Sequence, residues 1–600
     1  MSAQGSTPLG AQAEAGGVRF SAWSDRARAM TVVIYSDPGQ ITQEVALAPE
    51  GESGVFGGFV PRLAPGALYD FRIDGQLARD PYARALPYGV HGPARVLGEL
   101  PTPKHEKRAI DLGRGEVFYE LHVGTFTPKG TFASALGRLP YLRALGVSVI
   151  ELMPIAAFAG KRGWGYDGVA LFAPFAGYGS PEELATFIDA AHGEGLSVVL
   201  DVVYNHLGPA GNALPQFSES YFEAERSNAW GRAPALAKPA FRRLVLSNAA
   251  YWLNTLGFDG LRLDATHELE PGGEPHIVRA LSQVARACSP PALLVAEDNR
   301  NDPRSLFSHG IDAVWSDDFH HILHVLFTRE RDGYYRAFSG DLPELARVIE
   351  RGQLFEGQVV PGTSEPRGKS AAGVPAQRLL FALQNHDQVG NRAHGERLHQ
   401  LIEPALFRAA SLLLAFLPET PLLFMGQEWA ASSPFLYFSD HEGELGQAVT
   451  RGRREEFRHF SAFQAESAAI PDPQAESSFL SSKLDWAEQA RSEQQLTLDL
   501  YRRALALRRT DPVLQTPAPA SAGVAHDCLW VLRNTPRGSR LLLFNPGSAR
   551  SFARIADHSP QSTRPLLASC PIHGWNEQFE LPAQSALWLT VCDPAQPGRE

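Results

Sequence analysis

Eight short apolar runs recur between residues 117 and 429, and segments with a helical spacing of apolar residues separate them. In one such segment, Leu184 and Ile188 fall on the same face of a helix that Ser180 would cap. The runs are VFYELHV (117–123), VSVIELMPI (147–155), SVVLDVVYN (197–205), GLRLDA (260–265), ALLVAE (292–297), AVWSDD (313–318), RLLFALQNHD (378–387) and PLLFMGQEW (421–429). This alternation predicts an α/β fold, a (β/α)8 TIM barrel, with a doubly wound open sheet as the alternative.

The regions on either side of this alternating region consist of short strands separated by turn residues, which predicts two further β domains. We expect an N-terminal β-sandwich over residues 1–100, the barrel over 101–514 and a C-terminal all-β domain over 515–600. Within the barrel, residues 206–239 are too many for an ordinary connection between a strand and a helix. We therefore interpret 206–239 as a functional insertion.

Two charged residues interrupt one of the predicted barrel strands. A parallel strand that is covered on both faces is normally a continuous hydrophobic run. Arg262 and Asp264 break this rule two positions apart, so their side chains point to the same side of the strand. Burying such a pair costs stability unless the two groups satisfy each other, and a departure of this kind is typical of a functional site.

Polar residues also end other predicted strands, and the carboxyl ends of barrel strands carry the catalytic groups of this fold. Caps or surface groups account for a single carboxylate at a strand end, but not readily for five strands that end this way. We therefore expect a site at this rim. The strand ends are Tyr204-Asn205-His206, Arg262 with Asp264, Glu297-Asp298, Asp317-Asp318 and His386-Asp387.

Such a set of carboxylates suits the cleavage of a glycosidic bond. That reaction needs one ionised carboxylate near the sugar C1 and one protonated acid for the leaving oxygen. Arg262 would keep Asp264 ionised as the nucleophile, because a neighbouring cation lowers a carboxyl pKa. Glu297, flanked by Val295 and Ala296, is the candidate for the protonated acid.

Aromatic residues near these strand ends could stack on sugar rings. Each single one is more readily explained by core packing. The candidates are Tyr119, Trp164, Tyr166, Trp230, Trp315 and Trp429.

Four segments resemble the motifs of the α-amylase family of glycoside hydrolases, in the order and with the spacing of that family. The resemblance extends over nearly the whole chain, from the N-terminal sandwich, which is similar to carbohydrate-binding modules, to the C-terminal β domain. The four segments are DVVYNH (201–206), GLRLDATH (260–267), AEDNR (296–300) and QNHDQVGN (384–391).

The resemblance implies a role for each matching residue. It implies Asp264 as the nucleophile, Glu297 as the general acid and base, and Asp387 as a third carboxylate that holds sugar hydroxyls. Asn205 matches a position that binds calcium in some members, but the insertion lacks recognisable partner ligands, so we predict no metal and no cofactor. The implied contacts to the sugar at the cleavage point are Tyr166, His206, Arg262 and His386.

Within the family, the chain is similar to a subgroup that hydrolyses the α-1,4 bond next to the terminal trehalose of maltooligosyl trehalose. This similarity implies retention of configuration, trehalose as the product, and a pathway partner that synthesises maltooligosyl trehalose without necessarily binding this protein. Trp230 and the 162–167 loop are the candidates for recognising the trehalose unit. The segments that carry the similarity include YELHVGTFTPKGTF (119–132), LQNHDQVGNRAHGERL (383–398) and SKLDW (482–486).

Two alternatives stay open. A glycogen branching or debranching enzyme would share the sandwich and the barrel, but branching enzymes typically have Ser-His-Asp-Glu where this chain has Asn385 to Gln388. Loss of a catalytic carboxylate would favour a non-catalytic glycan-binding relative, but all three catalytic carboxylates are present in this chain. Residues 265–268 and 270–275 depart from the usual subgroup sequence.

Composition excludes several other functions. The formal net charge of −11 and the pI of about 6.0 argue against a surface that binds nucleic acid. No apolar run is long enough to span a membrane, and the N-terminus lacks the pattern of a secretory signal. The four cysteines show neither metal-binding spacing nor the density of a disulfide framework. We expect a cytoplasmic protein.

Overall fold

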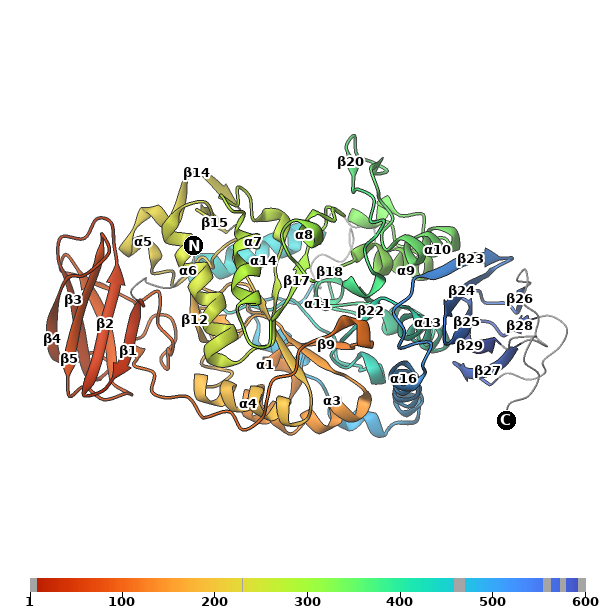
Figure 1. Ribbon diagram of the computed structural model, residues 1–600, viewed down its shortest axis with the longest axis horizontal. Coiled ribbons are helices and arrows are strands. Elements are labelled where there is room, and N and C mark those ends of the chain that lie inside the picture. Colours follow the sequence, from red (N-terminus) through yellow and green to blue (C-terminus); the bar gives the residue numbers. More distant parts are fainter. Residues whose placement is uncertain (1–7, 229, 458–469, 554–562, 572–578, 592–600) are drawn as a thin grey trace.

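The computed structural model describes residues 8–228, 230–457, 470–553, 563–571 and 579–591. Its described part forms an elongated molecule with the N-terminal strands at one end, a barrel in the middle and the C-terminal strands at the other end (Figure 1). This order confirms the predicted architecture. The predicted domain boundaries near residues 101 and 515 stay predictions.

The N-terminal strands form a twisted antiparallel sheet that folds over on itself as a sandwich, with pairing order β1-β2-β5-β4-β3-β6-β7 and β8 beside β6. Alternation explains its core: Val18 and Phe20 point inward and are fully buried, whereas Arg19 between them is partly exposed. The strands are β1 (Gly10–Glu14), β2 (Gly17–Trp23), β3 (Met30–Asp37), β4 (Gln40–Pro49), β5 (Val55–Pro61), β6 (Leu68–Ile73), β7 (Gln76–Ala78) and β8 (Ala94–Arg95).

The central strands close into a parallel barrel of eight strands within the described residues. Pairing of the last strand, β22, with the first, β9, excludes the doubly wound open sheet. Most strands are shorter than predicted, because residues at their carboxyl ends leave the strand pairing and belong to the rim loops. Around the barrel, the order is β9 (Phe118–Leu121), β10 (Val149–Leu152), β13 (Ser197–Val202), β16 (Gly260–Leu263), β17 (Leu293–Glu297), β18 (Ala313–Trp315), β21 (Leu379–Ala382) and β22 (Thr420–Phe424).

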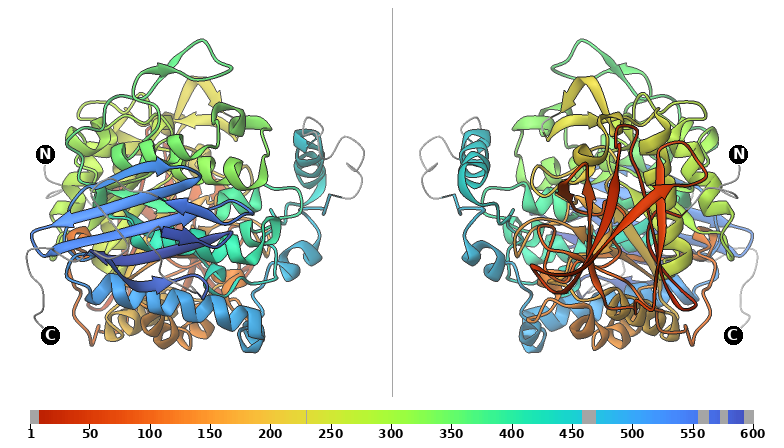
Figure 2. Two further views of the ribbon diagram at one scale, coloured as in Figure 1. Left: turned by 90° about the vertical axis from the view of Figure 1, so that its right-hand side faces the viewer. Right: turned by 90° about the vertical axis from the view of Figure 1, so that its left-hand side faces the viewer.

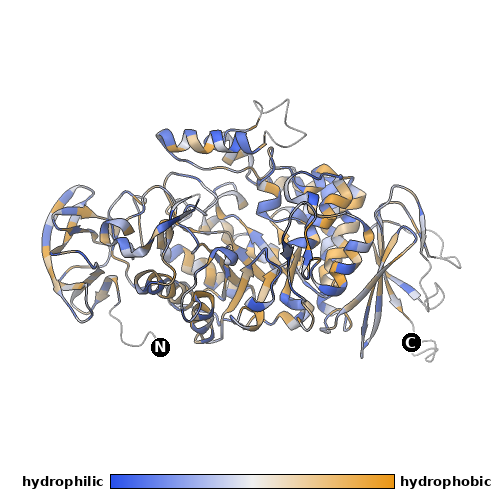
Figure 3. Cartoon of the chain, turned by 90° about the horizontal axis from the view of Figure 1, so that it is seen from above, coloured by the Kyte–Doolittle hydropathy of each residue, from blue (hydrophilic) through white to orange (hydrophobic). Residues whose placement is uncertain are grey.

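Helices surround the barrel, and hydrophobic residues gather on the central strands (Figure 3). Helix α4 begins as predicted, with the Ser180 hydroxyl accepting from the Glu183 N–H. The π-helix η3 (Tyr251–Leu256) continues α6. The helices are α1 (Val123–Phe126), α2 (Phe132–Leu136), α3 (Leu139–Leu145), α4 (Pro181–Gly193), α5 (Leu214–Phe217), α6 (Pro239–Ala250), α7 (Ile277–Arg286), α8 (Arg304–Phe307), α9 (Asp317–Thr328), α10 (Leu342–Arg351), α11 (His386–Gly390), α12 (Leu398–Leu401), α13 (Pro404–Phe416), α14 (Gly443–Phe457), α15 (Glu476–Ser481) and α16 (Ser492–Thr510).

The side chains inside the barrel change character along its axis. Near the amino ends of the strands, Phe118, Val149 and Val199 pack in one apolar cluster. Two residues further along, the same faces of the strands carry Glu120 and Asp201, which are buried. This alternation places charged groups directly beneath the rim, where the barrel meets the loops.

The insertion after β13 connects the barrel to the N-terminal sandwich. Helix α5 touches the sandwich at its far end, where the Ser24 hydroxyl donates to the Phe217 carbonyl at 2.5 Å (Figure 1). Trp23 meets Tyr221 edge to face at 5.5 Å between ring centroids. The insertion then forms a hairpin of β14 (Phe222–Asn228) and β15 (Gly231–Pro234) that returns to the rim. Minor strand pairs elsewhere are β11 (Ala156–Ala157) with β12 (Ala170–Pro174), and β19 (Gln358–Val359) with β20 (Pro366–Arg367).

Most of the described C-terminal strands form an antiparallel sheet, in the order β23-β24-β25-β29-β27, that packs on the barrel helices, as the left view of Figure 2 shows. Strands β26 and β28 form a separate antiparallel pair. Trp588 is fully buried at this contact, and its indole N–H donates to the Leu412 carbonyl at 3.2 Å. No helix in the described part of the chain is both long and apolar enough to cross a membrane. The strands are β23 (Ala520–Ala525), β24 (Cys528–Thr535), β25 (Gly538–Asn545), β26 (Ser551–Ala553), β27 (Thr563–Ala568), β28 (Phe579–Leu581) and β29 (Ser585–Val591).

Candidate active site

Arg262 is the centre of the charged residues at the barrel rim. Its side chain is fully buried, and its Nη1 donates to both carboxylate oxygens of Asp201, at 2.9 and 2.8 Å. The same nitrogen donates to Asp264 Oδ1 at 2.9 Å, and Nη2 donates to Glu297 Oε2 at 2.7 Å. The guanidinium carbon lies 4.2 Å from the ring centroid of Trp315. The predicted pairing of Arg262 with Asp264 is present, but the pair belongs to a group of four charged residues.

Glu297 has surroundings that differ from the prediction. Its position after Val295 and Ala296 suggested an apolar environment. In the structure, Glu297 Oε2 accepts from the Arg262 guanidinium and from the Ala265 N–H at 3.0 Å. The expected apolar surroundings considered only neighbours along the strand, whereas the contacts come from the adjacent strand β16 and the residues that follow it. The role of Glu297 as the acid stays a prediction.

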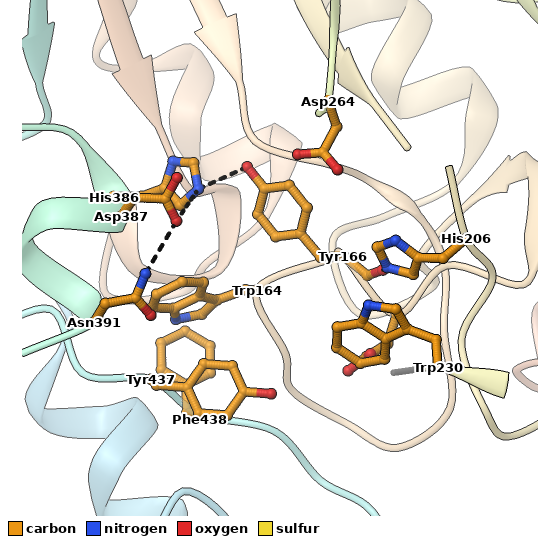
Figure 4. A pocket seen from close by; sticks show the side chains of 11 residues that line it. Trp164, Tyr166, His206, Trp230, Asp264, His386, Asp387, Asn391, Tyr437 and Phe438 are labelled. Atoms are coloured by element: carbon orange, nitrogen blue, oxygen red, sulfur yellow. Dashed lines mark hydrogen bonds and ion pairs between the residues drawn. The ribbon is translucent and has the colours of Figure 1, made fainter. Parts of the chain in front are cut away.

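Asp264 points into the cavity from the end of β16 (Figure 4). Its Oδ2 accepts from the Asn205 amide at 2.7 Å. Asn205, which matches a calcium-binding position in some family members, thus orients Asp264, the candidate nucleophile. Among the described residues, no group of three or more histidine, cysteine, aspartate or glutamate side chains is arranged to hold a metal ion. The absence of a metal and of a cofactor stays a prediction.

His386 connects the rim to a buried carboxylate. Its Nδ1 donates to Glu120 Oε1 at 2.5 Å, and its Nε2 donates to the Tyr166 hydroxyl at 2.8 Å. Tyr166 stacks on the imidazole at 5.1 Å and donates to Asp201 Oδ2 at 2.7 Å. Burial alone lowers the pKa of His386, but the carboxylates of Asp387 and Glu120 outweigh burial and raise this pKa to about 10. The imidazole is therefore a fixed cation beside Asp387.

Further acids lie beneath this layer. Glu151 of β10 is the register partner of Glu120 on β9, and both are buried inside the barrel. Burial, and then the charge of Glu120, raise the pKa of Glu151 well above its usual value. Burial also raises the pKa of Asp201 to about 7, although Arg262 opposes the shift. Two cations thus balance a larger number of carboxyl groups, some of which hold a proton near neutral pH.

Stability is expected to fall as the pH rises above about 6.5. The folded protein holds the His386 proton up to about pH 10, whereas an unfolded histidine loses it near 6.5. This contribution is therefore complete below 6.5 and is lost as the pH rises through 10. Urea unfolding measured at intervals from pH 6 to 9.5 should show this decline. Glu120→Gln should make the free energy of unfolding depend less on pH, whereas the exposed control His91→Gln should not change this dependence. Equal pH dependence in the wild type and both variants would contradict the raised pKa of His386.

The rim residues surround a cavity of about 220 Å³. Asp264 and Asp387 reach it from one side, and Trp230 stacks on His206 at 4.5 Å and 8° on another (Figure 4). Trp164, Tyr437 and Phe438 gather at a third side and provide flat apolar faces. Such a set of carboxylates and aromatic rings fits a sugar. The lining residues are Trp164, Tyr166, Asp167, His206, Trp230, Asp264, His386, Asp387, Asn391, Tyr437 and Phe438.

Three of the candidate stacking residues lie elsewhere. Tyr119 and Trp429 are fully buried, and the Tyr119 hydroxyl donates to Glu428 at 3.1 Å. Trp315 packs against Arg262 inside the barrel. These rings belong to the core. Their positions in the strands were not enough to distinguish a rim residue from an interior one.

The sequence analysis missed several cavity residues. Asn391 follows Asp387 by one helical turn and donates to its Oδ1 at 3.3 Å, a spacing that could have revealed it. Tyr437 and Phe438 come from the long segment after β22, and only the aromatic run FLYF pointed to them. Asp167 belongs to the 162–167 loop, which was predicted as a whole and not by this residue.

Comparisons with known proteins agree with this geometry. Residues 8–83 match the family model of carbohydrate-binding module 48 (isoamylase N-terminal domain), and residues 111–230 match that of the α-amylase catalytic domain. The malto-oligosyltrehalose trehalohydrolase of Deinococcus radiodurans is 48% identical over 92% of this chain and 91% of its own length. The chain belongs to the malto-oligosyltrehalose trehalohydrolase family.

Two further relatives extend over the whole molecule. The malto-oligosyltrehalose trehalohydrolase of Rhizobium sp. (strain M-11) is 38% identical over 96% of this chain and 98% of its own length. A crystal structure from Salmonella typhimurium, provisionally designated an α-amylase, is 36% identical, with a TM-score of 0.87 over 97% of this chain and 99% of its own. The likeness therefore includes the sandwich, the barrel and the C-terminal sheet together.

Proposed function

We propose that this protein is a retaining glycoside hydrolase that cleaves the α-1,4-glucosidic bond next to the terminal trehalose of maltooligosyl trehalose. The products are trehalose and a maltooligosaccharide. The names of the relatives support the substrate. The observation that carries the chemistry is that one buried guanidinium, Arg262, holds the carboxylates of both Asp264 and Glu297 at the rim.

In the first step, Asp264 attacks C1 of the glucose that precedes the trehalose unit. A bond forms between C1 and a carboxylate oxygen, the bond from C1 to the trehalose oxygen breaks, and Glu297 gives its proton to that oxygen. Arg262 and the Asn205 amide orient Asp264 for this attack.

In the second step, Glu297 removes a proton from water, which attacks C1 and releases Asp264. Two inversions at C1 retain the α configuration. This retaining mechanism requires carboxyl groups about 5–5.5 Å apart. In an inverting enzyme the two groups lie farther apart, because a water molecule must fit between them and the sugar. Proton NMR of the maltooligosaccharide released in this step should show the α anomer at its new reducing end before mutarotation.

The remaining rim residues bind the glucose at the point of cleavage. Asp387 and the His386 imidazolium hold its hydroxyls, and Tyr166 stacks on its apolar face. His206 and Trp230 form the wall of the cavity beside Asp264 (Figure 4). Charge-assisted hydrogen bonds bind hydroxyls more strongly than neutral ones.

A direct assay tests the substrate. Purified protein is incubated with maltotriosyl trehalose and, in parallel, with amylose, and the products are separated by chromatography. Release of free trehalose at a higher kcat/KM than the cleavage of amylose supports the proposal. New branch points in the amylose would instead support a branching enzyme, and binding without any product would support a non-catalytic relative.

Glu297→Gln is expected to lower kcat on maltotriosyl trehalose by about 10²–10⁴-fold and to leave substrate binding within about threefold. The amide keeps the shape of the carboxyl group but cannot protonate the leaving oxygen. Hydrolysis of α-maltotriosyl fluoride should suffer less, because fluoride leaves without a proton. The exposed Glu493→Gln is the matched control. Wild-type rates on both substrates would remove Glu297 from the mechanism.

The proposed substrate places the protein in a short reaction sequence. An enzyme that converts the reducing end of a maltooligosaccharide into a trehalose unit must supply maltooligosyl trehalose. We propose this synthase as a pathway partner, without a requirement for physical contact, and the cytoplasm as the compartment. Separation of the two activities on gel filtration would fit this arrangement.

A further inference from the structure

Asp387 is carried by a very short helix. Helix α11 contains five residues, His386–Gly390. A helix of this length is not stable by itself, because it makes few internal hydrogen bonds for the residues that it fixes. Contacts from outside must therefore hold both of its ends. At its first end, the Asn385 side chain accepts from the N–H groups of Asp387 and of the next residue, and the His386 N–H donates to Glu120 Oε2 at 3.0 Å.

The position of the Asp387 side chain follows the backbone of α11. This side chain is 34% exposed, and its Oδ1 accepts from the Asn391 amide at 3.3 Å, which is longer than a usual hydrogen bond. Figure 4 shows this bond at the cavity. Asn391 comes directly after the last residue of α11, so it moves together with this end of the helix. The group that holds the second end of α11 therefore also sets the position of the Asp387 carboxylate.

Arg453 holds this second end. It belongs to α14, in the long segment after β22, and its side chain is 8% exposed. Its Nη2 donates to the Gly390 carbonyl at 2.6 Å and to the Arg392 carbonyl at 3.1 Å. Carbonyl groups at the end of a helix lack partners within the helix and carry a partial negative charge. One guanidinium thus satisfies two such carbonyls, close to Asp387 in the chain.

The remainder of α14 makes the burial of Arg453 unusual. The helix lies at the edge of the molecule, apart from the barrel (cyan in Figure 2). Arg451, Gly452 and Arg454 are exposed, whereas Arg453 is buried among them. Taking a guanidinium out of water costs free energy that hydrogen bonds must offset, and an apolar side chain would attach the helix without this cost. The choice of arginine at this position therefore points to its two carbonyl partners.

The surroundings of Arg453 connect it to the wall of the cavity. Its guanidinium carbon lies 5.4 Å from the ring centroid of Tyr437, which lines the cavity, and 4.6 Å from that of Phe457. Phe457 packs in one apolar cluster with Ala393, which follows the bonded carbonyls. Towards the surface, Arg453 Nη1 donates to Glu456 Oε2 at 3.1 Å. These contacts give the guanidinium a single place between α14 and the segment that carries Asp387.

Helix α11 has a second close neighbour, Trp164. A side chain at Gly390 would place its Cβ 2.0 Å from Trp164 Cζ2, so only glycine lets the helix approach the indole this closely. The Trp164 N–H donates to the Leu436 carbonyl at 2.9 Å, next to the cavity residue Tyr437. Such close packing leaves α11 little freedom, and a small displacement of its second end would disturb it.

We propose that Arg453 is a positioning residue for hydrolysis, which fixes α11 so that Asp387 is held against the hydroxyls of the glucose at the point of cleavage. The inference rests on the role of Asp387 in the proposed function. Arg453 is not among the residues that line the cavity, so it acts through Asp387 and does not touch the sugar. Hydrogen bonds to these hydroxyls strengthen in the transition state, so a misplaced Asp387 lowers kcat more than it raises KM.

Arg453→Met is expected to lower kcat on α-maltotriosyl fluoride by about 5- to 50-fold and to change KM by less than about threefold. Methionine keeps much of the length of the side chain but cannot bond the two carbonyls. Lysine can bond one of them, so Arg453→Lys should recover part of the loss. Arg454→Met, which removes the exposed arginine next in the chain, is the matched control and should keep the wild-type kcat.

A double-mutant cycle separates this role from a general effect on the fold. In the Asp387→Asn background, Arg453→Met should lower kcat on the fluoride by less than about twofold, because no carboxylate is left to position. An equal loss in both backgrounds would show a merely structural role and overturn the proposal, as would a wild-type kcat in Arg453→Met. Thermal unfolding shows which variants fold. If Arg453→Met does not fold, the same cycle with Arg453→Lys should show a smaller loss that again disappears in Asp387→Asn.

The choice of the fluoride keeps this test separate from the proposed substrate. Fluoride leaves without a trehalose unit, so the cycle reports on Arg453 and Asp387 whatever the natural leaving group is. A wild-type kcat in Asp387→Asn would contradict the role of Asp387 and overturn the proposal with it. Hydrolysis of the fluoride without release of trehalose from maltotriosyl trehalose would contradict the proposed substrate alone, and the cycle would still decide the role of Arg453.

Discussion

Asp264→Asn is expected to lower kcat on maltotriosyl trehalose by roughly 10⁴-fold or more, the largest effect of any single substitution considered. Asparagine keeps the size of the side chain and can still bond Arg262 or Asn205, so the fold and substrate binding should survive. It has no anionic oxygen to attack C1, and the covalent intermediate cannot form. Single-turnover kinetics with saturating enzyme would measure the chemical step directly.

Trapping of the intermediate provides the control for this variant. A fluorinated maltosyl fluoride, which forms the glycosyl ester but releases it slowly, should add the mass of the sugar to the peptide that contains residue 264. The same treatment should leave Asp264→Asn unlabelled. A label on the peptide of Glu297 or Asp387, or more than a tenth of the wild-type kcat in the variant, would contradict the role of Asp264.

Arg262→Met is expected to lower the free energy of unfolding by about 3–5 kcal/mol, because removal of one partner leaves buried charges without compensation. The guanidinium is fully buried and bonds three carboxylates, those of Asp201, Asp264 and Glu297. Methionine has a similar length but no charge, so these carboxylates would repel one another at the rim. Activity should fall as well, since Asp264 and Glu297 lose their common support.

Urea unfolding of the variant and the wild type at pH 7 would measure this loss. The difference should shrink as the pH falls toward 4, because protonation of the carboxyl groups removes the repulsion. Arg114→Met is the matched control, since Arg114 is 83% exposed and its ion pair with Asp111 is on the surface. That control should change stability by less than about 0.5 kcal/mol. A loss below about 1 kcal/mol in Arg262→Met would show that the carboxylates find other partners.

The strand pattern was enough to predict the barrel and the position of its rim. Buried parallel strands are apolar along most of their length, so Arg262 and Asp264 stood out in the sequence. The list of rim residues was less reliable. Asp317 and Asp318 are adjacent in sequence, yet the Asp317 side chain is partly exposed, whereas Asp318 is fully buried and accepts from the Asn301 amide and the Leu354 N–H. Similarly, Trp164 lines the cavity while Trp429 lies in the core.

The contacts across strands could not be predicted. Arg262 meets Asp201 and Glu297 because β13, β16 and β17 are neighbours in the closed barrel. His386 becomes a cation because the carboxylate of Asp387 beside it and that of Glu120, which is 266 residues away in sequence and lies beneath it, together raise its pKa. Coulomb energies depend on distances of a few ångströms and on burial, which a linear sequence does not contain.

By itself, the sequence determined the fold class, the rim where the polar residues gather and the identity of the carboxylates, because hydrophobic periodicity and motif order are local properties. The tertiary structure decided how those carboxylates are held. It brought Asp201, Asp264 and Glu297 to one guanidinium and placed Glu120 under His386. The physical reason is closure of the barrel, which brings side chains from distant segments into a shared buried environment where their charges interact strongly.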